Sequence, residues 1–66
     1  MDELELRKRR CAAGYFTQVA MARKMGMTRA NYGNRERGTV RFSAAEIQRM
    51  CEYLGLSLEE GLKIMM

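Results

Sequence analysis

The sequence predicts an all-α fold, a compact domain of five short helices that takes in residues 1–66 as one unit. Three observations predict it. Proline is absent from the 66 residues. Apolar residues recur at spacings of three and four, as on one face of a helix. Hydroxyl residues and glycines stand where such helices would begin and end. A chain of this length has room for a single hydrophobic core.

The first predicted helix covers residues 2–13 and ends at Gly14, a residue type that suits a helix C-terminus. Its centre is the basic run 7–10, for which phosphate contact is the favoured role and a solvated helix surface the alternative. Few apolar residues remain for contact with a core: Leu4, Leu6, Cys11 and Ala13. We therefore expect this helix to be the weakest element of the fold.

The second and third predicted helices lie within residues 17–36 and are joined by a tight turn. Thr17 and Thr28 are hydroxyl residues at the expected N-caps, and Gly26 lies where the earlier helix must end. Phe16 and Met27 each precede a cap, as in a hydrophobic staple. The expected inner face comprises Met21, Met25, Met27 and Tyr32.

The outer face of the third helix is then free. It should present Arg29, Ala30, Gly33 and Asn34. Two helices joined by a glycine-containing turn, with the second one exposed in this way, form the helix-turn-helix arrangement that reads the major groove of DNA.

The fourth helix has the clearest start in the chain. After an exposed loop at residues 37–41, Ser43 and Glu46 form a capping box, and Phe42 and Ile47 supply the staple. One apolar stripe follows and ends at Gly55: Ile47, Met50, Cys51 and Leu54.

A second capping box, formed by Ser57 and Glu60, opens a fifth helix that reaches about residue 65. This helix has more apolar residues than so short an element can bury in one small domain. An excess of this kind often marks a partner surface, so Leu58, Leu62 and Met65 are predicted to form a homodimer interface. A frayed chain end is the alternative.

The charge is unevenly distributed. Residues 1–42 carry ten Lys or Arg and four Asp or Glu, a net charge of +6, whereas residues 43–66 carry two and four, a net charge of −2. A basic segment of this size favours a polyanionic partner. Double-stranded DNA is preferred to RNA, because few aromatic residues are available for stacking on unpaired bases.

Other functional classes find little support. The chain has no histidine and only two cysteines, Cys11 and Cys51, which are expected to be reduced thiols that act as small buried hydrophobes. We therefore expect neither an enzyme nor a cofactor or metal site. No signal peptide or membrane span is evident, so the predicted location is the cytoplasm.

Taken in order, these motifs resemble those of the lambda-repressor/Cro-type (XRE-like) helix-turn-helix family of phage and bacterial regulators, from Leu6 to Leu62. The segments that carry the resemblance are Phe16-Thr17-Gln18, Ala22, Met25-Gly26-Met27-Thr28, Tyr32, Glu36-Arg37-Gly38 and residues 54–60.

The resemblance implies an operator-binding repressor or other regulator that acts as a dimer with its third helix in the major groove. It assigns base reading to the positions of Arg29, Ala30, Gly33 and Asn34. Phosphate contact is assigned to Gln18, Thr28, Arg37 and Arg41, and the basic run of the first helix adds Arg10.

Two departures from the family pattern bear on this hypothesis. Arg35 stands where the family buries an apolar residue, so it must either pair with Glu36 or Glu46 or face DNA. Gly33 lies inside the base-reading helix, where it costs roughly 1 kcal/mol relative to alanine. The alternative function is therefore a protein-interaction module of the same fold, such as an antitoxin or a phage-encoded inhibitor, with weak or no specific DNA readout.

Overall fold

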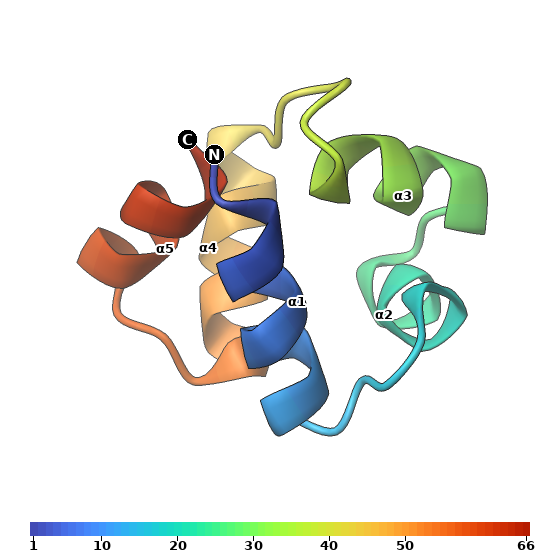
Figure 1. The fold of residues 1–66 in the computed structure, drawn as a ribbon, viewed down its shortest axis with the longest axis horizontal. Helices are drawn as coiled ribbons and strands as arrows, with labels where there is room; N and C mark the ends of the chain where they lie inside the picture. The colour runs from blue at the N-terminus through green and yellow to red at the C-terminus, as the bar shows by residue number, and fades with distance from the viewer.

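The computed structural model describes all 66 residues and contains five helices and no strand. The helices are α1 (Glu3–Ala12), α2 (Gln18–Met25), α3 (Arg29–Glu36), α4 (Ala44–Leu54) and α5 (Leu58–Met65). Figure 1 shows α2 and α3 together on one side of the molecule and α1, α4 and α5 on the other, with the two chain ends side by side. The predicted five-helix architecture is confirmed.

Local capping explains where the two middle helices begin and end. The hydroxyl oxygen of Thr17 accepts the backbone N–H of Ala20, and that of Thr28 accepts the backbone N–H of Asn31, both at 3.1 Å. Gly26 ends α2 in the left-handed conformation with φ of 72°, which is unfavourable for residues that carry a Cβ. The turn between α2 and α3 is therefore encoded locally, as predicted.

Both predicted capping boxes are present. Ser43 and Glu46 exchange hydrogen bonds between side chain and backbone at the start of α4, and Ser57 and Glu60 do so at the start of α5. Because each box satisfies donors that a helix start leaves without partners, the two helices begin at these serines.

The core lies between α4 and the other helices. The predicted stripe of α4 is buried along its whole length, and it is joined by residues from every other helix: Leu6, Met21, Met25, Tyr32, Ile64 and Met65. Phe42 packs its ring edge-on to that of Tyr32, with ring centroids 6.4 Å apart. Met27 is only half-buried against this core. Phe16 does not act as a buried staple, since 74% of its surface is exposed.

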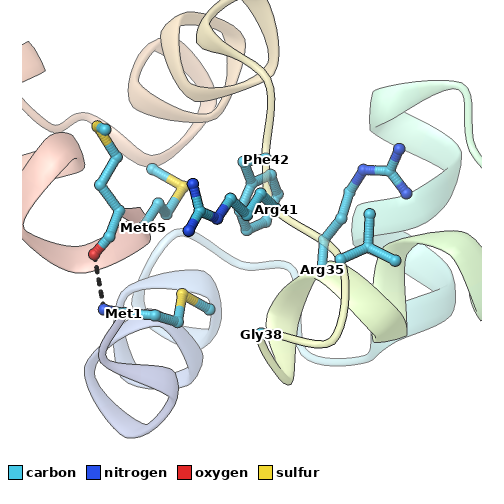
Figure 2. A pocket seen from close by; sticks show the side chains of 8 residues that line it. Met1, Arg35, Gly38, Arg41, Phe42 and Met65 are labelled. Atoms are coloured by element: carbon cyan, nitrogen blue, oxygen red, sulfur yellow. Dashed lines mark hydrogen bonds between the residues drawn. The ribbon is translucent and has the colours of Figure 1, made fainter.

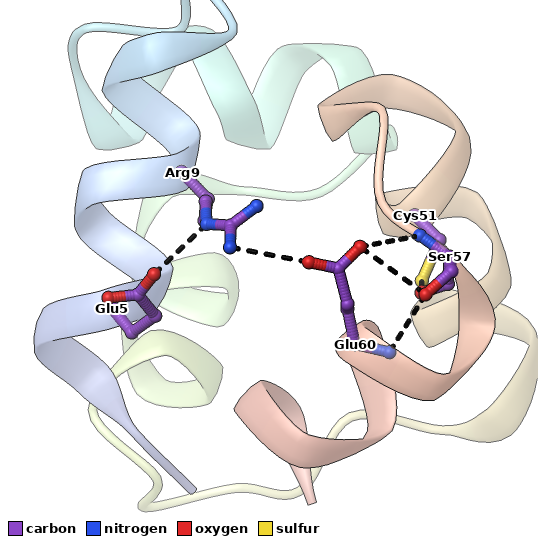
Figure 3. Close-up of polar contacts among 5 residues, drawn as sticks. All are labelled: Glu5, Arg9, Cys51, Ser57 and Glu60. Carbon is purple, nitrogen blue, oxygen red and sulfur yellow. Dashed lines mark hydrogen bonds and ion pairs between the residues drawn. The ribbon is translucent and has the colours of Figure 1, made fainter.

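Helix α1 contributes one apolar residue to the core and makes its other contacts through charged side chains. Of its four predicted core residues, only Leu6 is buried, so the prediction that Cys11 is a buried thiol was wrong. Arg9 connects α1 to α5, because its Nε donates to Glu5 at 3.0 Å and its Nη2 donates to Glu60 at 3.3 Å. Figure 3 shows this chain of contacts continuing from Glu60 to Ser57. The same glutamate therefore caps α5 and ties it to α1.

Helix α5 packs against α4 and α1. Met65 is buried in the core, so its assignment to a dimer interface is corrected. Leu58 and Leu62 remain 49% and 39% exposed. Gly61 faces Cys51 so closely that a Cβ at residue 61 would overlap the Cys51 sulfur. Burial raises the pKa of this thiol.

None of the five helices combines the length and apolar character that a membrane crossing requires.

Candidate nucleic-acid interface

The close approach of α2 and α3 presents α3 at the surface. Ala22 and Met25 are almost fully buried where the helices meet, and the small side chain of Ala22 allows the two backbones to come close. The backbone N–H of Met27 donates to the carbonyl of Ala22 at 2.9 Å, which fixes the turn that leads into α3. The rigid turn sets the direction in which α3 leaves the domain.

The exposed face of α3 carries most of the residues predicted to read bases. Arg29 and Ala30 are exposed and Asn34 is half-buried, while Tyr32 and Glu36 point into the domain and are fully buried. Gly33 is an exception to the prediction. It is buried, because the side chains of Gln18 and Arg37 cover the place where a Cβ would be. Without a side chain and with little exposed backbone, Gly33 offers no contact to a base edge.

A basic hollow of about 510 Å³ adjoins this face. It is lined by residues of α1, α2 and α3 together with the Thr17 cap: Glu3, Arg7, Arg10, Thr17, Gln18, Val19, Arg29 and Arg37. The N-terminus of α2 lies at the same hollow, since Thr17, Gln18 and Val19 line it, and the partial positive charge of a helix start favours anions there. Three arginines without a buried carboxylate partner (Arg7, Arg29 and Arg37) and a helix N-terminus make this hollow suitable for an anion such as a DNA phosphate.

Arg10 belongs to the wall of this hollow and is not a free cation. Only 4% of its surface is exposed. Its Nε donates to Glu36 at 2.9 Å and its Nη1 donates to the carbonyl of Tyr15 at 2.8 Å. The assignment of Arg10 to phosphate contact is therefore corrected, because its guanidinium is already engaged in balancing a fully buried carboxylate.

Glu36 organises the polar interior beneath α3. In addition to Arg10, it accepts from the Gln18 amide at 2.6 Å and from the Tyr32 hydroxyl at 3.4 Å. Burial raises the pKa of Tyr32, and the nearby charge of Glu36 raises it further. Sequence reasoning missed this role. The available signal was that Glu36 lies four residues after the inner-face residue Tyr32, at a position where the helix should be apolar.

Gln18 is positioned by this network at the first turn of α2. Its amide nitrogen has one proton committed to Glu36, and its side chain is half-buried at the edge of the basic hollow. An amide with two N–H groups can donate the second one elsewhere. Gln18 thus lies at the edge of the basic hollow with one amide N–H not bonded to Glu36.

Arg35 is engaged by partners within the domain. Its Nε donates to Glu46 at 3.0 Å and its Nη1 donates to the carbonyl of Asn31 at 3.0 Å. Of the two glutamates considered for Arg35, Glu46 is the partner. Burial opposes ionisation of Glu46, but the hydrogen bonds from the Ser43 backbone and from Arg35 outweigh it and lower the pKa of this carboxyl. Arg35 therefore links α3 to the capping box of α4.

The other residues predicted to contact phosphate do not all lie at the basic hollow. Thr28 caps α3, and Arg37 lines the basic hollow. Arg41 instead lines a second hollow of about 570 Å³ near the chain ends, together with Met1, Phe42 and Met65 (Figure 2). The N-terminal ammonium donates to the carbonyl of Met66 at 2.6 Å beside it. No group of three or more metal-ligating side chains comes together.

Comparison with known proteins agrees with this geometry. A family model described as a helix-turn-helix domain matches residues 4–61, which is most of the chain. No curated protein and no solved structure matches the chain.

Proposed function

We propose, because the chain belongs to the helix-turn-helix domain family, that it is a sequence-specific DNA-binding transcriptional regulator of the lambda-repressor/Cro type. One observation carries the proposal. The exposed side of α3 and the arginine-lined hollow at the start of α2 are contiguous, since Arg29 and Arg37 contribute to both. Groups suited to base edges and groups suited to phosphates therefore lie next to one another on the surface.

The side chains on α3 have the chemistry that base reading needs. The guanidinium of Arg29 can donate to both O6 and N7 of guanine, and the carboxamide of Asn34 can pair with the edge of adenine. Ala30 can offer a methyl contact to thymine. Gln18, Thr28, Arg37 and Arg41 are proposed to bind the phosphodiester chain and fix the register of α3 in the groove.

A homodimer is the proposed DNA-bound form. One reading helix spans only a few base pairs, and two-fold pairing of half-sites extends the recognised sequence. Leu58 and Leu62 support an interface on α5, because both stay partly exposed although they are apolar. The operator is expected to be a palindrome or near-palindrome.

Selection from a random-sequence duplex pool, followed by sequencing, tests the proposal directly. Enrichment of a palindrome is expected for the native chain. Arg29→Ala should reduce discrimination at one base pair of each half-site by about 1–3 kcal/mol and spare most nonspecific affinity. An unchanged preference in this variant would show that α3 does not read bases through Arg29.

Sedimentation of the chain with and without the selected duplex tests the dimer. Leu62→Asp should abolish self-association on DNA, because it places a charge in the proposed apolar contact. A monomer in both samples, unaffected by Leu62→Asp, would contradict the dimeric operator complex. It would instead favour the interaction-module function, in which the exposed leucines of α5 contact a different protein.

A further inference from the structure

Arg37 lies against α3 rather than extending from the loop that follows it. Its Nη2 donates to Oδ1 of Asn34 at 2.7 Å. Its Nη1 and Cζ lie 3.1 Å and 3.8 Å from the place where a Cβ of residue 33 would be. The guanidinium thus packs so closely over residue 33 that a Cβ there would require it to shift by a few tenths of an ångström.

This contact restrains the orientation of the Asn34 side chain. A free carboxamide can rotate to present either its oxygen or its nitrogen to a base, and the two ends read different bases. A charged donor at 2.7 Å directs the oxygen toward Arg37, and hydrogen bonds with charged donors are stronger than neutral ones. The amide therefore has a defined direction before DNA arrives.

We propose that Arg37 is a positioning residue for base readout by Asn34, and that Gly33 is present in α3 to admit its guanidinium. The inference rests on the proposed function, since it concerns how the same surface selects DNA. It gives Arg37 a role in specificity in addition to the phosphate contact assigned by resemblance. It also gives a reason for a helix-weakening glycine in the middle of the reading helix.

A purely electrostatic role for Arg37 predicts something different. Loss of a phosphate contact weakens binding to all sequences about equally, whereas loss of a positioning contact changes the preference at one base pair. Arg41 provides the matched control, because it is an exposed arginine of the same loop, has no hydrogen bond to α3, and lies beside the other hollow.

The experiment is selection of the random duplex pool with five chains in parallel: native, Asn34→Ala, Arg37→Ala, Gly33→Ala and Arg41→Ala. Asn34→Ala identifies the base pair that Asn34 reads. Gly33→Ala leaves the charge of the protein unchanged and favours the helix, but its Cβ would press on the guanidinium of Arg37 and on the amide oxygen of Gln18, each of which would have to shift by a few tenths of an ångström. Thermal unfolding of each variant confirms that it is folded.

Arg37→Ala is expected to reduce the preference at the Asn34 base pair by about tenfold, within the range of a single amide–base contact. Gly33→Ala, which shifts the guanidinium without removing it, is expected to reduce the same preference by a smaller factor. Arg41→Ala should weaken binding evenly and leave the selected sequence unchanged. If Arg37→Ala and Arg41→Ala both weaken DNA binding to all sequences equally and the preference at the Asn34 base pair stays intact, the inference is overturned. The proposed function would still stand. If the native chain enriches no sequence, both the proposed function and the inference about Arg37 are contradicted.

Discussion

Replacing Arg10 by methionine should destabilise the domain severely, because it leaves the carboxylate of Glu36 buried without its cation. The side chains of Arg10 and Glu36 are 5% and 0% exposed, and their Nε and Oε1 atoms lie 2.9 Å apart. Removal of one partner from a buried ion pair costs about 3–5 kcal/mol. The Gln18 amide stays bonded to the other oxygen of Glu36, so we expect a loss of about 3 kcal/mol, toward the lower end of this range.

This loss is large on the scale of the whole domain. A chain of this size has a total free energy of unfolding of about 3–10 kcal/mol. Urea unfolding followed by circular dichroism should therefore show a midpoint shifted far to lower denaturant, or no folded baseline at all, for Arg10→Met. The matched control is Arg9→Met, one residue away, whose exposed ion pairs with Glu5 and Glu60 should contribute little.

A double variant identifies the physical origin of the loss. Arg10→Met combined with Glu36→Gln removes the unpaired charge but keeps an acceptor for the Tyr32 hydroxyl, so it should recover most of the stability lost in Arg10→Met. If the double variant is no more stable than Arg10→Met alone, the uncompensated charge of Glu36 is not the cause of the lost stability. The cause would then be the lost packing of the arginine side chain.

Three further predictions concern DNA binding, packing and pH. If Arg7, Arg37 and Arg41 each neutralise one phosphate, a plot of the logarithm of the DNA association constant against the logarithm of salt concentration should have a slope of about −3 per protomer. Filter binding measures this slope, and an association constant that does not change with salt would contradict a DNA-facing basic surface. Gly61→Ala should lower the free energy of unfolding by about 1–3 kcal/mol, because its Cβ would overlap the sulfur of Cys51. Adding Cys51→Ala should restore part of the lost stability. Equal stability of the native and Gly61→Ala chains in urea unfolding would refute the tight packing. Hydrogen bonds from the Ser57 backbone lower the pKa of Glu60, and the pKa of Glu46 is also lowered. Their ionised forms thus stabilise the fold above the unfolded carboxyl pKa of about 4.3, and this contribution is lost as the pH falls through the lower folded values. Replacing both by glutamine, which keeps the capping geometry, should flatten the acid limb of a stability–pH curve measured by thermal unfolding.

Much of the fold could be predicted from residues close together in the chain. The caps at Thr17, Thr28, Ser43 and Ser57 act within one helical turn, so the identity and spacing of a few neighbours suffice to locate the helix starts. The stripe of α4 was equally readable, because a helix places every third or fourth side chain on one face regardless of what it packs against. The outward position of Arg29 and Ala30 follows from the same periodicity.

What only the tertiary structure decided is how side chains from distant segments meet. Arg10 and Glu36 are 26 residues apart, and nothing local distinguishes a buried arginine from its exposed neighbours in a basic run. The same limit explains why Met65 was assigned to a surface and why Cys11 was expected to be buried. Periodicity defines which residues share a face, whereas the packing of other helices determines which face is covered. Gly33 was therefore visible in the sequence only as a cost to α3, and its closeness to Gln18 of α2 emerged only when α2 and α3 came together.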